Sequence, residues 1–469
     1  MTVMRLTSPR LVVAGLAGDS GKTLLTLGLA RSLRERGLAV RTAKKGPDYI
    51  DAGWLAAASG SACVNLDTFM MPRAGIGSGA ASLEGADVVM VEGNRGLYDG
   101  VDAEGTHSTA ELAKLLGSPV LLVVDVAKAS RTVAAQVLGC QMLDPALRLA
   151  GVVLNRVGTA RQQALVRSAM EEVTGLPVVG ALPRLSGADL LPGRHLGLVT
   201  VAEHPDGEGA IARAAEAVAR HVDIDRVLDL ARSAVDVELP LLRVEAEPRR
   251  CRVGYLADPA FSFYYPENLE SLRRRGAELV AVAPEESAAL PRLDALYIGG
   301  GFPEVHAGRL AGSGALFGAL RDHAAAGLPI YAECGGLMLL ARELVIDGSS
   351  HPMAGVLDLV VEQTPRPQGH GYEVVRVDRR NPFFPAGTSL AGHEFHYSRV
   401  VAGADAASTV LAVERGCGIG AGRDGIVKGR VWASYLHLHA LGTPGWADGF
   451  LGMAARCAAE RAGTAVAGV

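Results

Sequence analysis

A glycine-rich segment near the N-terminus carries the residue types that bind phosphate. Residues 15–23 read Gly-Leu-Ala-Gly-Asp-Ser-Gly-Lys-Thr and lie between an apolar run and an amphipathic stretch. Backbone N–H groups at the start of a helix carry positive partial charge and hold phosphate oxygens. We expect Lys22 to reach the terminal phosphates and the Thr23 hydroxyl to bind magnesium. The expected ATP-binding residues of this loop are Gly18, Asp19, Ser20, Gly21, Lys22 and Thr23.

The segment differs from the common phosphate-loop pattern because Leu16 stands where the first glycine is usual. A chance Gly-Lys-Thr in a glycine turn is the alternative, but the strand–loop–helix context favours nucleotide binding. Ala17 stands where partition-type ATPases carry a second lysine, which weighs against a dimerising partition switch.

Acidic residues follow where a metal ion would lie beside bound phosphates. Asp48 and Asp51 occur in a turn-rich stretch, Glu92 ends an apolar run, and Asp99 lies in the next glycine loop. Carboxylates at the carboxyl ends of parallel strands lie in the ligand crevice, and hard oxygen ligands suit magnesium. We expect Thr23, Glu92 and Asp48 to bind the metal, and Asp48 and Asp99 to position a substrate carboxylate. A solvated loop carboxylate is the alternative for each acid.

Asn155 follows an apolar run over 151–154 and is a further candidate for nucleotide binding. Its amide could read the edge of a purine base, because an amide offers both a donor and an acceptor. An ordinary polar loop residue is the alternative at this position.

A cysteine in the second half stands where a nucleophile would be exposed. Cys334 lies between a short apolar run over 330–332 and an expected helix over 337–343, and Gly335 follows it directly. A thiol on a sharp strand-to-helix turn is open to substrate, and the helix N-terminus stabilises its thiolate. An ordinary buried thiol is the usual fate of cysteine and is the alternative here.

Two further segments supply the partners that a thiol nucleophile needs. A Gly-Gly-Gly-Phe-Pro-Glu run contains Gly300 and Gly301, whose backbone N–H groups, with that of Gly335, are candidates for binding an oxyanion. Downstream, His437 follows an expected strand over 431–436 and can act as the base. The elbow, the glycine loop and the histidine together favour catalysis over the structural alternative for each part.

These residues follow short β-branched runs that alternate with amphipathic stretches rich in alanine and leucine. In the first half we expect strands over 11–14, 87–91, 120–125 and 151–155, and helices over 23–36, 131–143 and 161–173. In the second half we expect strands over 252–256, 296–298, 330–332 and 431–436. The alternation indicates an α/β fold in which βαβ units form parallel sheets.

The chain of 469 residues is long enough for two domains. The first alternation ends in a charged segment over 207–235 that we expect to be helical. The stretch 240–250 is charged and contains two prolines, so it is the expected boundary. We therefore expect one domain over 1–240 and a second over 250–469.

Composition argues against several classes of protein. The 46 Lys and Arg residues against 50 Asp and Glu residues give a formal charge of −4, which is unlike a nucleic-acid binder with a large basic surface. No apolar run approaches the ~18–20 residues of a membrane helix, so we expect no membrane partner. The six cysteines include no Cys-x-x-Cys pair. We therefore expect no disulfide framework and a reducing, cytoplasmic location.

Several motifs share one order along the chain. In the first half they are Gly-Lys-Thr at 21–23, Gly-Pro-Asp-Tyr-Ile-Asp at 46–51, Glu-Gly at 92–93 and Asp-Gly at 99–100. In the second half they are the glycine run at 299–304, Glu-Cys-Gly-Gly at 333–336, Gly-His-Glu-Phe-His-Tyr-Ser at 392–398 and Tyr-Leu-His-Leu-His at 435–439. In this order the chain resembles the cobyrinic acid a,c-diamide synthases over nearly its whole length.

The resemblance implies a P-loop domain like that of dethiobiotin synthetase, joined to an α/β domain like those of class I glutamine amidotransferases. It implies a C–N ligase of cobalamin biosynthesis, in which ATP and Mg²⁺ activate the a and c side-chain carboxylates of cobyrinic or hydrogenobyrinic acid as acyl phosphates. Ammonia from glutamine then forms the amides. Glutamine and a tetrapyrrole are thus the expected partners, and a homodimer is compatible with this assignment.

Departures from the family pattern leave alternatives open. His439 stands where class I amidotransferases carry the glutamate of a His-x-Glu pair, so we expect a Cys334–His437 pair in place of a full triad. Lys-Lys-Gly at 44–46 and Asn-Arg at 94–95 resemble a branch that includes siroheme amidases of sulfur metabolism, so siroheme is the alternative macrocycle. A P-loop regulatory ATPase with a degenerate amidotransferase domain is the alternative from another class, and the intact cysteine and histidine weigh against it.

Overall fold

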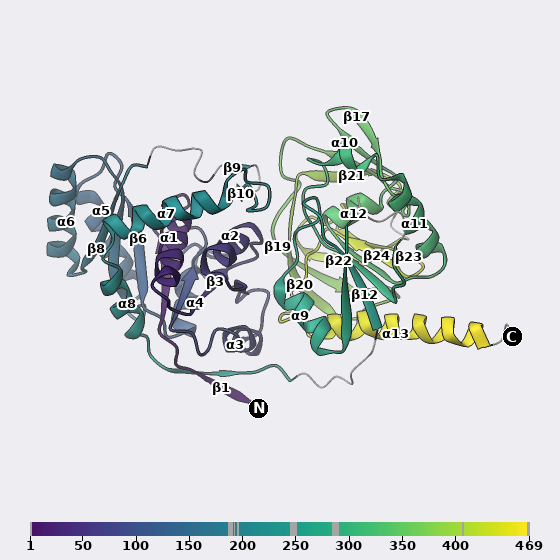
Figure 1. Cartoon of the computed structure of the whole chain (residues 1–469), viewed down its shortest axis with the longest axis horizontal. Coiled ribbons are helices and arrows are strands. Elements are labelled where there is room, and N and C mark those ends of the chain that lie inside the picture. The colour runs from purple at the N-terminus through teal and green to yellow at the C-terminus, as the bar shows by residue number, and fades with distance from the viewer. Residues whose placement is uncertain are drawn as a thin grey trace. The chain divides into compact units, whose positions relative to one another are not determined.

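The computed structural model describes residues 2–185, 191, 193–194, 197–243, 251–283, 290–405 and 408–466. The chain forms two compact units, Met1–Leu242 and Arg243–Val469, which Figure 1 colours from purple to yellow in chain order. The expected boundary over 240–250 falls partly outside the described residues, because 244–250 are not among them.

The first unit contains a seven-stranded parallel sheet. Its strands are β2 (Arg10–Gly15), β3 (Val40–Lys45), β4 (Val64–Leu66), β5 (Val88–Glu92), β6 (Val120–Asp125), β7 (Leu149–Val157) and β8 (Val178–Pro183). They are ordered β4-β3-β5-β2-β6-β7-β8. Every residue of β2 and β5 is buried, so both faces of the sheet are covered. The sequence correctly predicts β2, β5, β6 and β7 to within two residues at each end.

Eight helices are described in the first unit. They are α1 (Lys22–Glu35), α2 (Ile50–Ser59), α3 (Arg73–Ala81), α4 (Thr109–Leu115), α5 (Arg131–Leu143), α6 (Ala160–Thr174), α7 (Gly207–His221) and α8 (Ile224–Arg232). Helix α1 packs closely on α7, because a Cβ on Gly28 would lie 2.6 Å from the carbonyl oxygen of Ala214. The expected helical segment over 207–235 is two helices, since Val222 is extended and the Asp223 side chain caps α8.

The two ends of the first unit are paired with each other. Strand β1 (Val3–Leu6) runs antiparallel to β11 (Val237–Pro240). Helix α3 lies close against β11, because a Cβ on Gly77 would be 2.1 Å from the carbonyl oxygen of Pro240. A further short antiparallel pair consists of β9 (Gly193–Arg194) and β10 (Gly197–Leu198).

The second unit contains a nine-stranded mixed sheet. Its parallel strands are β12 (Cys251–Leu256), β13 (Ala277–Val282), β14 (Ala295–Ile298), β15 (Ile330–Glu333) and β24 (Val431–Ser434). Its antiparallel strands are β19 (Gly369–Val377), β20 (Ser389–His396), β22 (Thr409–Arg415) and β23 (Arg423–Lys428). The order is β13-β12-β14-β15-β24-β23-β22-β19-β20. The sequence predicts the parallel strands β12, β14, β15 and β24 but not the antiparallel half.

A smaller sheet and five described helices complete the second unit. The sheet, ordered β17-β16-β18-β21, consists of β16 (Glu343–Ile346), β17 (Ser349–Pro352), β18 (Val360–Gln363) and β21 (Ser398–Ala402). The helices are α9 (Pro266–Arg274), α10 (Ala307–Leu310), α11 (Gly314–Ala325), α12 (Gly335–Leu340) and α13 (Gly445–Val466).

Two predicted element ends in the second unit are wrong. The helix expected over 337–343 ends at Leu340, because the next residue is extended and the backbone N–H of Arg342 bonds to Leu359. The strand expected over 431–436 ends at Ser434. The two following N–H groups donate to the side chain of Asp424 on β23 rather than to the backbone of a neighbouring strand.

Alternate residues of β14 and β15 face two separate cores of the second unit. Tyr297 and Tyr331 belong to an aromatic core that also contains Trp446, whereas Cys334 belongs to a largely aliphatic core on the other face. Glu333 comes two residues after Tyr331, so it shares the aromatic face. The nucleophile candidate and the acid before it therefore leave the strand on opposite sides.

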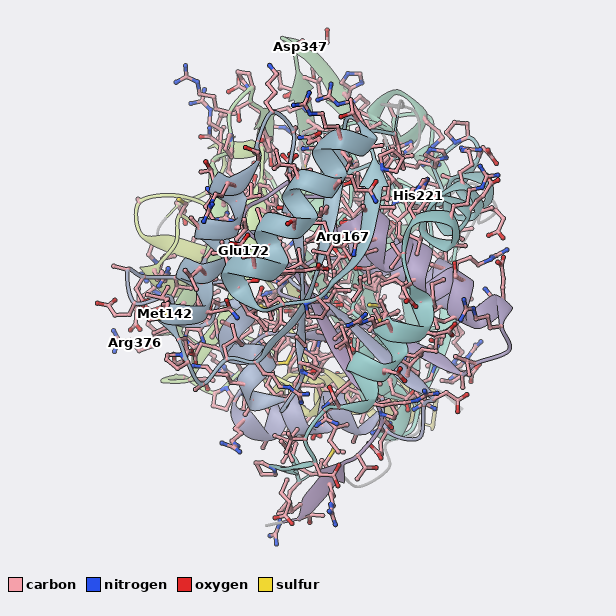
Figure 2. All side chains as sticks on the ribbon, turned by 90° about the vertical axis from the view of Figure 1, so that its left-hand side faces the viewer. Met142, Arg167, Glu172, His221, Asp347 and Arg376 are labelled. Atoms are coloured by element: carbon pink, nitrogen blue, oxygen red, sulfur yellow. The ribbon has the colours of Figure 1, made fainter. Side chains whose placement is uncertain are left out.

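Helix α6 is part of the outer surface of the first unit. Figure 2 shows Arg167 and Glu172 on this helix, and Met142 of α5 is 71% exposed. Among the helices in the described ranges, none combines the length and the apolar character that crossing a membrane requires.

Candidate functional site

The phosphate loop runs from the end of β2 to the first residue of α1. Gly21 has φ +96°, a left-handed conformation that favours glycine. The Ser20 hydroxyl donates to the carbonyl oxygen of Ala17 at 2.6 Å and closes the loop, and the Lys22 ammonium donates to the same oxygen at 3.1 Å. The loop therefore places backbone N–H groups at the N-terminus of a 14-residue helix, as phosphate binding requires.

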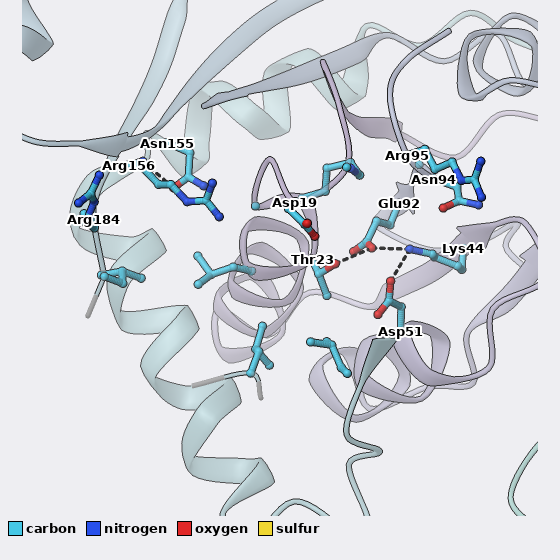
Figure 3. A pocket seen from close by; sticks show the side chains of 18 of the residues that line it. Asp19, Thr23, Lys44, Asp51, Glu92, Asn94, Arg95, Asn155, Arg156 and Arg184 are labelled. Carbon is cyan, nitrogen blue, oxygen red and sulfur yellow. Dashed lines mark hydrogen bonds and ion pairs between the residues drawn. The ribbon is translucent and has the colours of Figure 1, made fainter. Parts of the chain in front are cut away.

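A buried lysine, for which the sequence predicts no role, lies beside this loop. The Nζ atom of Lys44, on β3, is 2.6 Å from Oδ2 of Asp51 and 2.7 Å from Oε1 of Glu92 (Figure 3). The same Oε1 of Glu92 accepts a hydrogen bond from the Thr23 hydroxyl at 3.0 Å. Oδ2 of Asp48 is 3.7 Å from Nζ of Lys44. These contacts join the start of α1 to the ends of β3 and β5.

The charges in this cluster depend on one another. Burial lowers the pKa of Lys44, but the carboxylates of Asp51, Glu92 and Asp48 outweigh it and raise that pKa well above its usual value. Burial raises the pKa of Glu92, and burial together with the charge of Asp51 raises the pKa of Asp48 to about 7. Burial acts in the same direction on Asp51, but the Lys44 ammonium outweighs it and lowers the pKa of that carboxyl. Lys44 therefore remains an ammonium ion at neutral pH.

The residues around Thr23 fit a magnesium ion shared with phosphates. Oε2 of Glu92 is buried and has no hydrogen-bond partner among the residues that the structure describes. A hydroxyl and one carboxylate, completed by phosphate oxygens, are a typical magnesium environment. No group of three or more His, Cys, Asp or Glu side chains in the described part of the chain is placed to hold a metal ion alone. The geometry therefore suits a metal that arrives with a nucleotide.

The other predicted residues of this site support its loops. Oδ1 of Asp48 accepts the N–H of Asp51 at 2.9 Å, at the start of α2. Oδ2 of Asp99 accepts the N–H of Gly96 at 2.7 Å, in the loop after β5. A Cβ on Gly96 would lie 2.8 Å from the carbonyl oxygen of Leu16, so this turn lies directly against the phosphate loop. The expected roles of Asp48 and Asp99 toward metal and substrate stay predictions.

Asn155, near the end of β7, contacts the phosphate loop and holds it in place. Its Nδ2 donates to the carbonyl oxygen of Ser20 at 2.8 Å, and a Cβ on Gly21 would lie 2.1 Å from the same nitrogen. The side chain is thus fixed beside the loop. Its expected contact with a nucleotide base stays a prediction.

A pocket of about 550 Å³ opens over these residues and carries more positive than negative side chains. The cationic lining residues are Lys22, Lys44, Arg95, Arg156 and Arg184, and the acidic ones are Asp19, Asp51 and Glu92. The lining also includes Gly18, Gly21, Thr23 and Asn155 from the predicted site. A cleft with an excess of positive charge attracts an anionic ligand.

In the basic part of this lining the sequence predicts Lys22 but not Lys44, Arg95 or Arg184. Lys44 and Arg95 belong to segments that the sequence marks only as departures from a family pattern, and Arg184 receives no role. A usable signal is their position, because Lys44 is on β3 near its carboxyl end, Arg95 follows β5, and Arg184 follows β8. The carboxyl ends of neighbouring parallel strands meet at one edge of the sheet.

In the second unit, Cys334 forms a sharp elbow between β15 and α12. Its φ of +47° is unusual for a residue other than glycine and stores local strain. Its N–H donates to the carbonyl oxygen of Ser434 at 2.7 Å, so the ends of β15 and β24 are tied together at the candidate nucleophile. Burial raises the pKa of the Cys334 thiol well above its usual range. The thiol therefore needs a base to take its proton.

The predicted base, His437, lies against Gly300 of the glycine loop, and this loop also lies against the Cys334 elbow at Gly335. A Cβ on Gly300 would lie 2.5 Å from Cε1 and 3.3 Å from Nε2 of His437. A Cβ on Gly335 would lie 3.0 Å from the nitrogen of Gly301. The elbow, the glycine loop and the histidine thus form one site. A side chain at position 300 would collide with His437, and one at position 335 would crowd the backbone of Gly301. The oxyanion role of the three glycine N–H groups stays a prediction.

A second histidine, for which the sequence predicts no role, packs on the base. His393 of β20 exchanges two backbone hydrogen bonds with His437, and the two rings stack with centroids 4.7 Å apart. Burial, and then the neighbouring His437, hold the pKa of His393 well below its usual value. The 392–398 motif therefore fixes the base from one side with a neutral ring.

Two known protein families match this chain, and each match covers one of the two sites. The CobQ/CobB/MinD/ParA nucleotide binding domain matches residues 11–199, which include the phosphate loop and Glu92. The CobB/CobQ-like glutamine amidotransferase domain matches residues 252–444, which include Cys334 and His437.

Individual relatives match across both units. The chain is 42% identical to the cobyrinate a,c-diamide synthase of Magnetococcus marinus, over 94% of this chain and 96% of that protein. It is 41% identical to the cobyrinate a,c-diamide synthase of Archaeoglobus fulgidus, with 94% and 96% covered. It is 40% identical to the hydrogenobyrinate a,c-diamide synthase of Rhodobacter capsulatus, with 92% and 98% covered.

Proposed function

The chain belongs to the cobyrinate a,c-diamide synthase family, and from this premise we propose that it amidates the a and c side-chain carboxylates of cobyrinic or hydrogenobyrinic acid. ATP supplies the phosphoryl group and glutamine supplies the nitrogen. The observation that carries this proposal is that one chain holds both a phosphate loop and a cysteine–histidine site, each assembled from residues of its own unit.

In the first half-reaction, a carboxylate oxygen of the macrocycle attacks the terminal phosphorus of ATP, and ADP leaves. The loop N–H groups and Lys22 hold the phosphates, while the Lys44 ammonium supplies a fixed positive charge beside them. Thr23 and Glu92 would hold a magnesium ion beside the phosphates, where it would supply positive charge to the phosphoryl oxygens. The product is an acyl phosphate of the macrocycle.

In the second half-reaction, Sγ of Cys334 forms a bond to the side-chain amide carbon of glutamine. His437 takes the thiol proton and returns it to the leaving nitrogen, so ammonia departs as the C–N bond breaks. Backbone N–H groups of Gly300, Gly301 and Gly335 stabilise the oxyanion. Water then hydrolyses the thioester to glutamate. Ammonia attacks the acyl phosphate, and phosphate leaves as the amide forms.

The charge of the first pocket supports a substrate with several carboxylates. Five cationic side chains outnumber three acidic ones in its lining. Arg95 lines this pocket next to Glu92 and Lys44, close to where the phosphoryl group would be transferred. An arginine binds a carboxylate through two parallel hydrogen bonds, which suits a macrocycle with acidic side chains.

None of the findings supports the two alternatives, a siroheme amidase and a regulatory ATPase with a degenerate amidotransferase domain. The three relatives described above are named for corrinoid amidation. A homodimer and a cytoplasmic location stay predictions.

The test is to incubate the purified protein with ATP, magnesium and glutamine and with cobyrinic acid, hydrogenobyrinic acid or siroheme, and to weigh the products by mass spectrometry. We expect two successive replacements of a hydroxyl by an amino group on a corrinoid acid, none without ATP, and none on siroheme. Amidation of siroheme alone, or no ATP-dependent amidation of any macrocycle, would overturn the proposal.

A further inference from the structure

His439 occupies the position at which a His-x-Glu pair would place its acid, but its contacts lead away from the base. The side chain is fully buried. Its Nδ1 accepts the N–H of Leu441 at 3.1 Å, and its Nε2 lies 3.4 Å from Oε2 of Glu267 on α9. These polar contacts of the two ring nitrogens therefore involve Leu441 and Glu267 and not His437.

A different carboxylate lies beside the base. Glu333 is the last residue of β15, directly before the nucleophile, and is completely buried. Its Oε2 is 3.8 Å from Nδ1 of His437. The other edge of this imidazole, with Cε1 and Nε2, lies against Gly300. Because successive strand residues point to opposite faces, Glu333 approaches His437 from the aromatic core and leaves the side of Cys334 open.

Three donors hold the Glu333 carboxylate in place. The Tyr297 hydroxyl donates to Oε2 at 2.8 Å, and the Tyr331 hydroxyl donates to Oε1 at 3.2 Å. The backbone N–H of Leu438 donates to Oε1 at 3.1 Å. Since Leu438 follows the base directly, the same carboxylate fixes both the backbone and the ring of His437. Burial, and then the charge of Glu333, raise the pKa of both tyrosines, so both remain hydrogen-bond donors.

Resting on the proposed glutamine chemistry, we propose that Glu333 is the positioning carboxylate of the site and holds Nδ1–H of His437 so that Nε2 takes the Cys334 proton. The 3.8 Å separation shortens to a hydrogen bond when His437 becomes positively charged, since catalytic contacts tighten as the reaction proceeds. When the S–C bond forms, the thiol proton moves to Nε2, and the same proton leaves with ammonia. Glu333 itself keeps its negative charge throughout.

The titratable groups around His437 decide how proton transfer between Cys334 and His437 depends on pH. They are Glu333 from β15, Cys334 from the elbow and His393 from β20, and His439 follows in the chain. Because burial keeps His393 neutral, it adds no positive charge beside the imidazolium at neutral pH. Glu333 therefore supplies the compensating charge that lets the imidazolium and the thiolate form together.

The test replaces Glu333 by glutamine, which keeps its size and one acceptor oxygen. The new amide can donate to Nδ1 and favours the tautomer whose Nε2 already carries a proton. We expect kcat/KM for glutamine hydrolysis to fall at least about a hundredfold. The pH profile of Cys334 alkylation by iodoacetamide should move to higher pH, while amidation with ammonium chloride is retained. Glu333→Asp should restore part of the activity and of the profile.

Glu267→Gln is the matched control, because Glu267 is a largely buried acid in the same unit that lies beside His439 rather than His437. It should leave the rate and the alkylation profile near wild type. Wild-type hydrolysis and an unshifted profile in Glu333→Gln would overturn the positioning role. Loss of the proposed glutamine chemistry is a separate outcome, recognised when Cys334→Ser still hydrolyses glutamine.

A second variant keeps the proposal testable if Glu333→Gln fails to fold. Tyr297→Phe removes one donor to Oε2 and leaves the carboxylate in place. We expect hydrolysis to slow by several-fold, on the order of one lost hydrogen bond to a charged group, with a shift of the profile in the same direction. A folded Tyr297→Phe protein with an unchanged rate and profile would overturn the proposal.

Discussion

The two units keep their reactive groups in opposite surroundings. In the first unit, charged side chains line an open pocket of about 550 Å³, and the Lys44 ammonium is held by carboxylates of opposite sign. In the second unit, Cys334 is only 6% exposed, and burial keeps its thiol neutral until a base acts. Phosphoryl transfer depends on charge that is already in place, whereas a thiol nucleophile gains from being shielded from water.

The same architecture underlies both surroundings. Each site is built at the carboxyl ends of adjacent parallel strands, β2, β3 and β5 in the first unit and β14, β15 and β24 in the second. Parallel sheets place ligands at this edge whatever the chemistry. The difference between the sites therefore comes from the residue types in the loops and not from the topology.

The largest effect that separates the two sites is expected from Cys334→Ser. Without the thiol, glutamine-dependent amidation should fall by roughly 10⁴-fold or more, while amidation with ammonium chloride stays near the wild-type rate. Product formation with each nitrogen source, followed by mass spectrometry, measures both. Cys417→Ser, which changes an exposed thiol in the same unit, is the control and should keep both rates. An equal loss of both activities would contradict the separation of the sites.

Lys22→Ala tests whether the two sites work separately by disabling the phosphate loop of the first unit. Loss of the charge that holds the phosphates should slow amidation by at least about a hundredfold with either nitrogen source. Glutamine hydrolysis should persist, because Cys334 and His437 are untouched. Lys114→Ala is the control, since this lysine forms surface ion pairs with Glu111 and Asp144. ATP hydrolysis at the wild-type rate in Lys22→Ala would show that the assigned role is wrong.

Glu92→Gln sharpens the comparison by separating metal binding from charge in general. Glutamine keeps the acceptor for Thr23 but removes a negative charge and a metal ligand. We expect activity at low magnesium to fall about tenfold or more and the half-saturating magnesium concentration to rise. Titration of magnesium at saturating ATP measures this, with Glu111→Gln as the surface control. An unshifted curve at wild-type activity would leave Glu92 as a structural residue.

The smallest effect concerns stability and comes from Asp48. Its folded-state pKa of about 7 exceeds the usual 3.8, so the folded chain binds this proton more tightly than the unfolded chain does. The wild type therefore loses stability as pH rises from about 4 to about 7, and Asp48→Asn does not share this loss. We expect the variant to gain on the order of 1 kcal/mol over wild type across that range.

Thermal unfolding of the unliganded proteins between about pH 5 and about pH 8 measures this difference, since that range spans the titration of Asp48. The gap in Tm should widen with pH and then level off once the pH exceeds the folded-state pKa. The side-chain amide in Asp48→Asn keeps an acceptor oxygen for the Asp51 N–H, so the start of α2 should be preserved. If the difference in Tm between the two proteins is constant with pH, folding does not raise the pKa of Asp48. No comparable gain is expected from Cys334→Ser, because burial already keeps the Cys334 thiol uncharged.

Features that depend on neighbouring residues could be predicted from the sequence. The loop from Gly15 to Lys22 lies where a strand meets a helix, and Cys334 forms the expected elbow. The strand β6 and the helix α5 have the predicted bounds, because their apolar patterns and their flanking turns are local.

Features that depend on distant residues could not be predicted. Lys44 acquires its role in part from Glu92, which is 48 residues further along the chain, together with Asp48 and Asp51 just after β3. The contact of Glu333 with His437 depends on how β15 pairs with β24, where Glu333 stands opposite Ser434. The antiparallel half of the second sheet likewise depends on non-local pairing, for which the sequence carries only a weak alternating signal.

The pairing of β1 with β11 has a consequence beyond catalysis. The strand at the beginning of the first unit and the strand at its end lie side by side, in register from Val3 and Pro240 to Leu6 and Val237. A unit whose ends meet in this way can be joined to another chain at a single point without a break in its sheet. The nucleotide-binding unit therefore has the geometry of an exchangeable module, since both of its ends leave it at the same place.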